Sequence, residues 1–163
     1  YKGIYGFSES EIPLTVPFFQ KLACEHFSSV CVFAEMADVV KNLSKIFTLV
    51  MLSGNYSEVV MRTLMKEKLD KYFLRIFGND DFDGIDKSNP KFFYRSLDVL
   101  NLEKDNVILL TDTSGEIYAA KRVDIPVIAC AWGWQDRDDL VEAGPDYLAD
   151  SPGELFQIAQ SLK

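Results

Sequence analysis

The sequence predicts an α/β fold, Rossmann-like, in which a parallel sheet forms the middle of three layers and helices cover both faces. From about residue 30 onward, short runs typical of strands alternate with stretches whose apolar residues recur at helical spacing. Such alternation is typical of parallel strands that are joined by helices. With 163 residues, of which 48% are hydrophobic, the chain is long enough for one domain with a substantial core.

The first predicted elements of this body are a helix, a strand and a second helix. One helical face carries the apolar residues Met36, Val39, Val40 and Leu43. The mostly apolar run from Phe47 to Leu52 is expected to form a buried strand, which Ser53-Gly54-Asn55 ends. The next helix is expected to turn four residues inward: Val60, Met61, Leu64 and Met65.

The second half of the chain continues the same alternation. A helix is expected to begin near Pro90, because proline suits the first helical turn. Further strands are expected at 107–110, 127–130 and 147–149, with a short helix at 116–122. Ser151-Pro152-Gly153-Glu154 has the form of a capping box and predicts a final amphipathic helix. The first 29 residues differ, since Pro13 and Pro17 interrupt them, and they are interpreted as part of a helical attachment to the body at 30–163.

Charge and composition narrow the classes of partner. The formal net charge of -8 argues against nucleic acid or an anionic membrane surface, because phosphate groups would be repelled. The longest apolar runs are too short to cross a bilayer, so a soluble, cytoplasmic protein is expected. Cys24, Cys31 and Cys130 are odd in number and lack CxxC spacing, so buried thiols are expected. The single His26 offers no second histidine for a metal or catalytic pair.

Polar side chains at the ends of two predicted strands are the candidates for function. Ser53 and Asp112 each follow an apolar run, and ligands of open parallel sheets gather at the carboxyl ends of strands. Lys87 lies in a polar loop and Glu116 follows Asp112 by four residues. Each feature alone has a simpler explanation, since Ser and Asp after a strand are commonly helix caps. Their joint order predicts a phosphoryl-transfer site.

These motifs resemble those of the haloacid dehalogenase-like hydrolase superfamily, and in particular its phosphoglycolate phosphatase-like branch. The resemblance covers roughly residues 30–162. It is carried by Ser53, by Lys87-Ser88-Asn89-Pro90, by Thr111-Asp112-Thr113-Ser114-Gly115-Glu116, by Val123-Asp124-Ile125-Pro126-Val127-Ile128 and by Ala131-Trp132-Gly133-Trp134. It implies that residues 1–29 are the remnant of a helical cap.

The resemblance also implies a mechanism and a role for each residue. Phosphoryl transfer would pass through an aspartyl-phosphate intermediate with Mg²⁺ as cofactor, on a small phosphorylated metabolite. Ser53 would bind a phosphoryl oxygen, with Asn55 as a further polar contact, and Lys87 would hold the nucleophile and offset negative charge. Asp112 would bind the metal, and Glu116 would bind it or hold a metal-bound water.

Three positions depart from the family pattern. Thr111 stands where the family has glycine, Glu116 where it has aspartate, and Ser88 where it has the first proline after the lysine. The longer side chain of Glu116 is the departure expected to change how a metal site is supported.

The aspartate nucleophile of the family, in an Asp-x-Asp motif at the end of the first strand, has no counterpart upstream of Ser53. Asp81-Phe82-Asp83-Gly84 matches the letters, but it runs directly into the lysine motif and is interpreted as a solvated loop. Because the first strand lies in the middle of the sheet, a segment that carries it is expected to precede Tyr1.

Three functions remain open on the sequence. The favoured one is a Mg²⁺-dependent phosphomonoester hydrolase whose nucleophile lies outside these residues. The second is a catalytically inactive member of the superfamily that serves as a binding or structural protein. The weakest is a dehalogenase, because the motif from Asp112 to Glu116 is of the metal-binding kind that this reaction does not use.

Overall fold

The computed structural model describes residues 30–33 and 35–163, together with Ser8, Thr15, Phe18, Lys21, Leu22, Glu25 and His26. Most of the expected cap remnant at 1–29 therefore lies outside the described residues, and the division from the body at 30–163 stays a prediction. In chain order the elements are α3 (Met36–Leu43), β1 (Leu49–Leu52), α4 (Ser57–Lys66), the 3-10 turn η2 (Asp70–Tyr72), β2 (Phe73–Phe77), α5 (Pro90–Leu100), the 3-10 turn η3 (Lys104–Asn106), β3 (Leu109–Thr111), α6 (Ser114–Lys121), β4 (Val127–Cys130), α7 (Arg137–Ala143), β5 (Tyr147–Ala149) and α8 (Pro152–Ser161).

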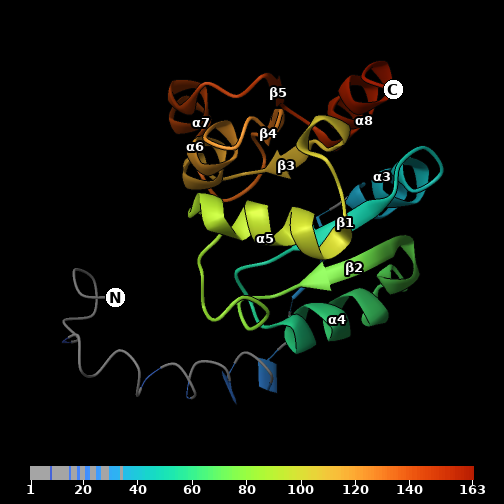
Figure 1. Cartoon of the computed structure of the whole chain (residues 1–163). Helices are drawn as coiled ribbons and strands as arrows, with labels where there is room; N and C mark the ends of the chain where they lie inside the picture. The colour runs from blue at the N-terminus through green and yellow to red at the C-terminus, as the bar shows by residue number, and fades with distance from the viewer. Residues whose placement is uncertain are drawn as a thin grey trace.

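The strands form two parallel sheets with helices on both faces, which confirms the predicted fold class (Figure 1). β1 pairs with β2, so that Leu52 lies opposite Phe77. The larger sheet has the order β3-β4-β5, with Thr111 opposite Ala129. In Figure 1 the arrows of β2 and β3 point to the same side, so the loops that follow β1, β2 and β3 leave the body on that side.

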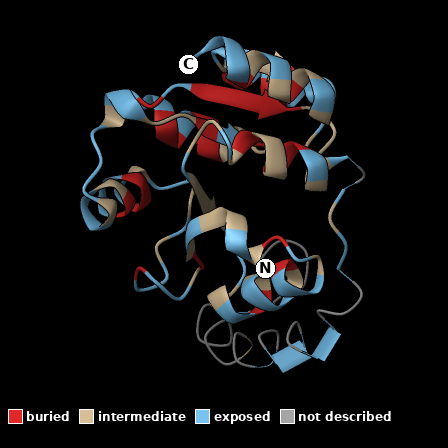
Figure 2. Cartoon of the chain, turned by 90° about the vertical axis from the view of Figure 1, so that its right-hand side faces the viewer, coloured by how far each residue is buried: buried red, intermediate tan, exposed pale blue. Residues whose placement is uncertain are grey.

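β4 is the centre of the core and is buried along its whole length (Figure 2). Successive side chains of a strand point to opposite faces. Val127 and Ala129 pack in the cluster with α6 and α7, whereas Ile128 and Cys130 pack in the cluster with α3 and α8. The large sheet is therefore the middle layer of three, as the sequence predicts.

The small sheet continues this middle layer. Val50 and Leu52 pack with the buried rings next to α5, and Met51 packs on the opposite face with α3 and α4. Leu52 also contacts the cluster of α6 and α7, and Leu49 contacts the cluster of α3 and α8. Both faces of the two sheets are thus covered by shared clusters.

A gap separates the two sheets inside this common layer. Within the described residues, β1 and β3 are not hydrogen bonded to each other, so each presents an edge with unpaired backbone groups. β1 is only partly buried along its length, although the sequence predicts a buried strand, because pairing covers one of its edges alone. Leu110 of β3 is 36% exposed.

Helix α4 forms as predicted, but two of its residues that were expected to be buried are exposed. Met61 and Met65 are 40% and 58% exposed, whereas Val59 and Leu64 are buried. The apolar stripe of this helix is wide, and its residues that pack with the sheet are Val60 and Leu64, so periodicity alone made the buried face too broad. The sequence also gave no prediction of β2, whose apolar run is broken by the exposed Arg75.

The predicted starts of two helices are confirmed by their caps. The side chain of Asn89 accepts from the Lys91 amide at 3.0 Å at the start of α5, with Pro90 in the first turn. The Ser151 hydroxyl oxygen accepts from the Glu154 amide at 3.2 Å, and the Glu154 carboxylate accepts from the Asp150 amide at 2.8 Å. The Ser151 half of the capping box is thus formed, and the Glu154 carboxylate reaches the amide one residue before the N-cap.

Candidate active site

Three loops on the same side of the molecule, together with the start of α6, carry the predicted site residues. Ser53 directly follows β1, and Asp112 directly follows β3. Glu116 lies in the first turn of α6, and Lys87 lies in the loop before α5. Because the strands are parallel and α6 begins at the end of β3, these positions share one rim of the sheets (Figure 1).

Lys87 and Glu116 are in direct contact. The Lys87 ammonium lies 2.7 Å from Glu116 Oε1, and the two side chains are 20% and 10% exposed. The Thr111 hydroxyl donates to the other carboxylate oxygen, Oε2, at 2.8 Å. A largely buried carboxylate needs such partners, since desolvation would otherwise be costly. Glu116 therefore fixes the Lys87 ammonium at the end of β3.

Asp112 is held by the loop that follows β4. Its Oδ2 accepts from the Trp134 amide at 2.7 Å. Gly133 allows this approach, because a methyl group at that position would overlap the Asp112 side chain. Next to it, the Ser114 amide donates to the Gln135 side-chain oxygen, which caps α6 from the same loop. These contacts leave Oδ1 of Asp112 as the oxygen that can face a ligand.

Ser53 lies across the gap, on the small sheet. Its amide donates to the Phe77 carbonyl at 2.9 Å, and its hydroxyl oxygen accepts from the Asn55 amide at 3.1 Å. The hydroxyl proton thus remains available to a ligand. Ser53 and Asn55 line a cavity of about 380 Å³ whose other walls include Val59 and Val60.

The structure brings some predicted site residues into contact and keeps others apart. Lys87 and Glu116 form one network, and Asp112 adjoins it through Thr111. Ser53 and Asn55 belong to the small sheet, and among the described residues no hydrogen bond or ion pair joins them to this network. The structure therefore places the predicted site residues on two different sheets and in two separate hydrogen-bond networks.

Sequence reasoning missed the residues that support the site: Thr111, Gly133, Trp134 and Gln135. In the sequence Thr111 was noted only as a departure from a family glycine, yet its hydroxyl donates a hydrogen bond to Glu116. The Ala131-Trp132-Gly133-Trp134 run was part of the resemblance, and its glycine was the available signal for a close approach of two loops.

The residues present fit a magnesium ion in part. Asp112 offers a carboxylate oxygen, the kind of ligand that Mg²⁺ prefers, and Mg²⁺ is commonly held by one or two carboxylates together with water and substrate phosphate. Both oxygens of Glu116 are occupied by Lys87 and Thr111. Over residues 30–33 and 35–163, no three Asp, Glu, His or Cys side chains gather into a metal site of their own. Metal binding by Asp112 and Glu116 stays a prediction.

Cys130 lies at the end of β4 beside Asp112. Burial, and then the negative charge of Asp112, raise the pKa of the Cys130 thiol to about 12. In the folded protein we expect this thiol to resist iodoacetamide at about pH 8, because the thiolate is the reactive form. Peptide mass spectrometry after alkylation, with and without denaturant, measures this. Cys31, which is exposed rather than buried as predicted, is the internal control; equal labelling of the two thiols would contradict the expectation.

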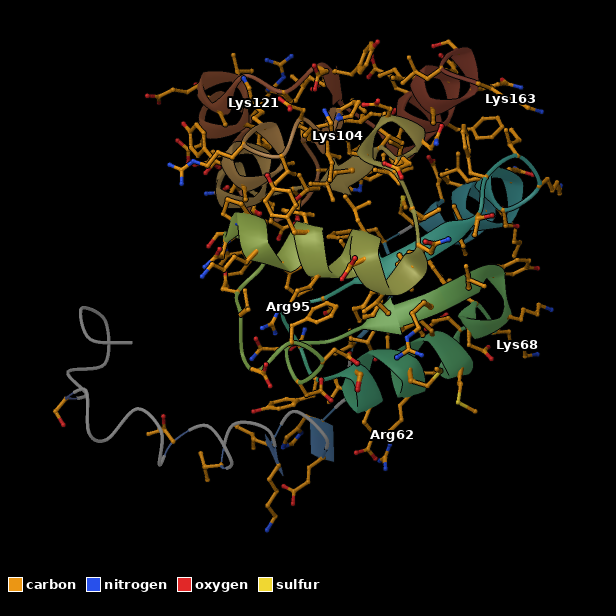
Figure 3. All side chains as sticks on the ribbon, in the orientation of Figure 1. Arg62, Lys68, Arg95, Lys104, Lys121 and Lys163 are labelled. Atoms are coloured by element: carbon orange, nitrogen blue, oxygen red, sulfur yellow. The ribbon has the colours of Figure 1, made fainter. Side chains whose placement is uncertain are left out.

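Basic side chains are dispersed over the surface. Figure 3 labels basic side chains in different parts of the chain, among them Arg62, Arg95, Lys104 and Lys121. Arg95 is paired with Asp83, and Lys104 is paired with Asp124.

Among the described residues, each helix falls short of the length and apolar character that a bilayer crossing requires. A cytoplasmic location stays a prediction.

Comparison with known proteins identifies the family. Residues 4–130 match the family model of the haloacid dehalogenase-like hydrolases. This match covers well over half of the chain. The chain belongs to this family of hydrolases, as its ordered motifs indicate.

Curated relatives of the chain are phosphatases. It is 24% identical over 112 residues to a phosphoglycolate phosphatase of Vibrio parahaemolyticus, which covers 69% of this chain and 49% of the relative. It is 25% identical over 114 residues to the pyrophosphatase PpaX of Listeria welshimeri, covering 70% of this chain and 52% of the relative. For a phosphoglycolate phosphatase of Aquifex aeolicus the identity is 28% over 115 residues, 71% of this chain and 52% of the relative. The chain thus spans about half the length of these relatives.

Solved structures show the same fold. A protein from Clostridium acetobutylicum, described as a "predicted phosphatase", superposes with a TM-score of 0.88 at 20% identity, over 98% of this chain and 74% of that one. A "predicted phosphoglycolate phosphatase" from Haemophilus somnus superposes with a TM-score of 0.80 at 18% identity, over 94% and 69%. At these identities the likeness establishes the fold.

Proposed function

We propose that the full-length protein is a Mg²⁺-dependent phosphomonoester hydrolase that acts on a small phosphorylated metabolite through an aspartyl-phosphate intermediate. The observation that carries this proposal is the buried Lys87–Glu116 pair beside Asp112, across the inter-sheet gap from Ser53. Phosphoglycolate phosphatases and a pyrophosphatase among the relatives support the reaction class.

Each half of the site has a separate task. Ser53 donates its hydroxyl proton to a phosphoryl oxygen, and Asn55, two residues further along the same loop, adds a polar contact. Lys87 supplies positive charge to the oxygens of the transferred group, and Glu116 keeps the ammonium in place. When bound, Mg²⁺ would neutralise charge on the phosphoryl oxygens. Asp112, with Oδ2 fixed by the Trp134 amide, would be its ligand through Oδ1.

The attacking carboxylate belongs in the gap between β1 and β3. A strand inserted there, parallel to both, would pair with both free edges and cover the exposed face of Leu110. Its carboxyl end would emerge between Ser53 and Asp112, because the neighbouring strands end there. An aspartate at that end would lie between the phosphate-binding hydroxyl and the Lys87 ammonium.

The test is release of inorganic phosphate from an aryl phosphate by the full-length protein. We expect activity with Mg²⁺, none after treatment with EDTA, and recovery when Mg²⁺ is added back. Undiminished activity in EDTA would contradict the metal requirement. A stably folded full-length protein that releases no phosphate would favour the alternative of an inactive binding protein.

A further inference from the structure

The loop that follows β2 is hydrogen bonded to the segment that follows β1. Asp80 lies in the first of these loops, and Ser57 opens α4 at the end of the second. The Ser57 amide donates to Asp80 Oδ1 at 2.7 Å, and the Ser57 hydroxyl donates to Asp80 Oδ2 at 2.7 Å. Both oxygens of one carboxylate therefore bind one residue that lies 23 positions earlier in the chain.

Two more contacts fasten the same pair of loops. The Asn79 amide donates to the Asn55 carbonyl oxygen at 2.9 Å. Gly78 permits the close approach, because a methyl group there would overlap the Ser57 amide and lie 2.7 Å from Ser57 Cα. The segment from Gly78 to Asp80 thus holds in place the backbone between β1 and α4, which carries Ser53 and Asn55.

Asp80 supplies the hydrogen-bond acceptor that the N-terminus of α4 otherwise lacks. Tyr56, at the N-cap position, makes no side-chain hydrogen bond to the helix, and the first amides of a helix need acceptors. The Asp80 carboxylate provides an acceptor and places negative charge at the positive end of the helix. Burial by itself would raise the pKa of Asp80, but the hydrogen bonds from Ser57 outweigh it and hold the pKa below the ordinary value. The carboxylate is therefore charged at neutral pH.

We propose that Asp80 is a positioning residue for the phosphate-binding loop: by capping α4 through Ser57, it keeps Ser53 and Asn55 in the orientation in which they meet a phosphoryl group. The inference rests on the proposed function for the role of Ser53, whereas the hydrogen bonds between Asp80 and Ser57 do not depend on that function. Asp80 itself does not touch the substrate.

The experiment compares full-length variants in phosphate release from an aryl phosphate. Asp80→Ala is expected to raise both KM and the inhibition constant of inorganic phosphate about tenfold, with a smaller change in kcat, because a hydrogen bond to a charged group is lost from the binding loop. Asp80→Asn is expected to recover most of this loss, since its amide oxygen can accept from the Ser57 amide and its nitrogen can donate to the Ser57 hydroxyl. The control is Asp83→Asn, in the same loop, where the carboxylate is exposed and paired with Arg95; asparagine also suits the left-handed backbone at this position, so the variant should behave as wild type.

Two readouts separate positioning from a general structural effect. In the background of Ser53→Ala, the Asp80→Ala substitution should add little to KM, because both act through one hydroxyl. Hydrogen exchange of the Ser57 amide should be about tenfold faster in Asp80→Ala than in wild type. Additive effects on KM, or unchanged exchange at Ser57, would overturn the proposal. If the wild-type protein releases no phosphate, the proposed function fails on its own, and the exchange measurement still decides whether Asp80 orders the loop.

Discussion

Gly133→Ala is expected to reduce kcat/KM for phosphate release by about a hundredfold or more, although it removes no polar group. A methyl group at this position would overlap the Asp112 side chain and lie 2.6 Å from its carboxyl carbon. Relief requires Asp112 or the loop after β4 to move, and either movement disturbs the hydrogen bond from the Trp134 amide to Asp112 Oδ2. Displacement of the carboxylate that is proposed to bind the metal by about an ångström is sufficient for a loss of this size.

The matched control is Gly153→Ala in α8, where a methyl group would meet its nearest neighbour, the Ser151 hydroxyl oxygen, at 3.9 Å. This is an ordinary contact, so activity and stability should stay at wild-type levels or improve slightly. Asp112→Ala gives the lower bound of activity. The Mg²⁺ concentration for half-maximal activity should rise in Gly133→Ala, which a purely structural defect would not cause. Wild-type kcat/KM and Mg²⁺ dependence in a folded Gly133→Ala protein would show that the position of Asp112 is immaterial.

The elements that sequence reasoning placed correctly are those with strong local signals. Pro90 and the Ser151 capping box determine the starts of α5 and α8 through contacts a few residues away. β4 is a short apolar run bounded by Pro126, and its side chains on both faces are buried. Signals of this range are present in the sequence itself.

The errors arose where burial depends on a distant neighbour. Met61 and Met65 belong to an apolar stripe, but which part of the stripe is buried depends on where the sheet lies. β1 is apolar enough for a central strand, and its partial exposure comes from the gap at one of its edges. Periodicity within one segment carries no information about either neighbour.

The candidate site shows the same division. The order of Ser53, Lys87 and Asp112 could be recognised along the chain, and the structure shows Lys87 in contact with Glu116. The hydrogen bond from Trp134 to Asp112 joins residues 22 positions apart, and that from Ser57 to Asp80 joins residues 23 apart. Such contacts depend on how two loops are brought together by parallel strands, so spacing in the sequence does not predict them.

Lys87→Met is expected to lower both stability and activity, by different mechanisms. The substitution leaves the Glu116 carboxylate, 10% exposed, with the Thr111 hydroxyl as its remaining partner. Removing one member of a buried ion pair costs about 3–5 kcal/mol, and the residual exposure of both side chains reduces this to about 2 kcal/mol of unfolding free energy. Urea denaturation measures that loss. Activity should fall about a hundredfold or more, because the positive charge that is proposed to act on the transferred group is gone.

A second substitution separates the two effects. In Lys87→Met/Glu116→Gln the uncompensated charge is removed while the amide can still accept from Thr111, so stability should recover most of the loss and activity should not. Lys104→Met is the matched control: its ammonium pairs with Asp124 at the surface, and screening by water makes such pairs weak, so neither quantity should change measurably. If Lys87→Met were as stable as wild type, the Lys87–Glu116 contact would contribute nothing to the free energy of unfolding. If the double variant regained activity together with stability, Lys87 would act only by neutralising Glu116, and the ammonium would have no direct role at the phosphoryl group.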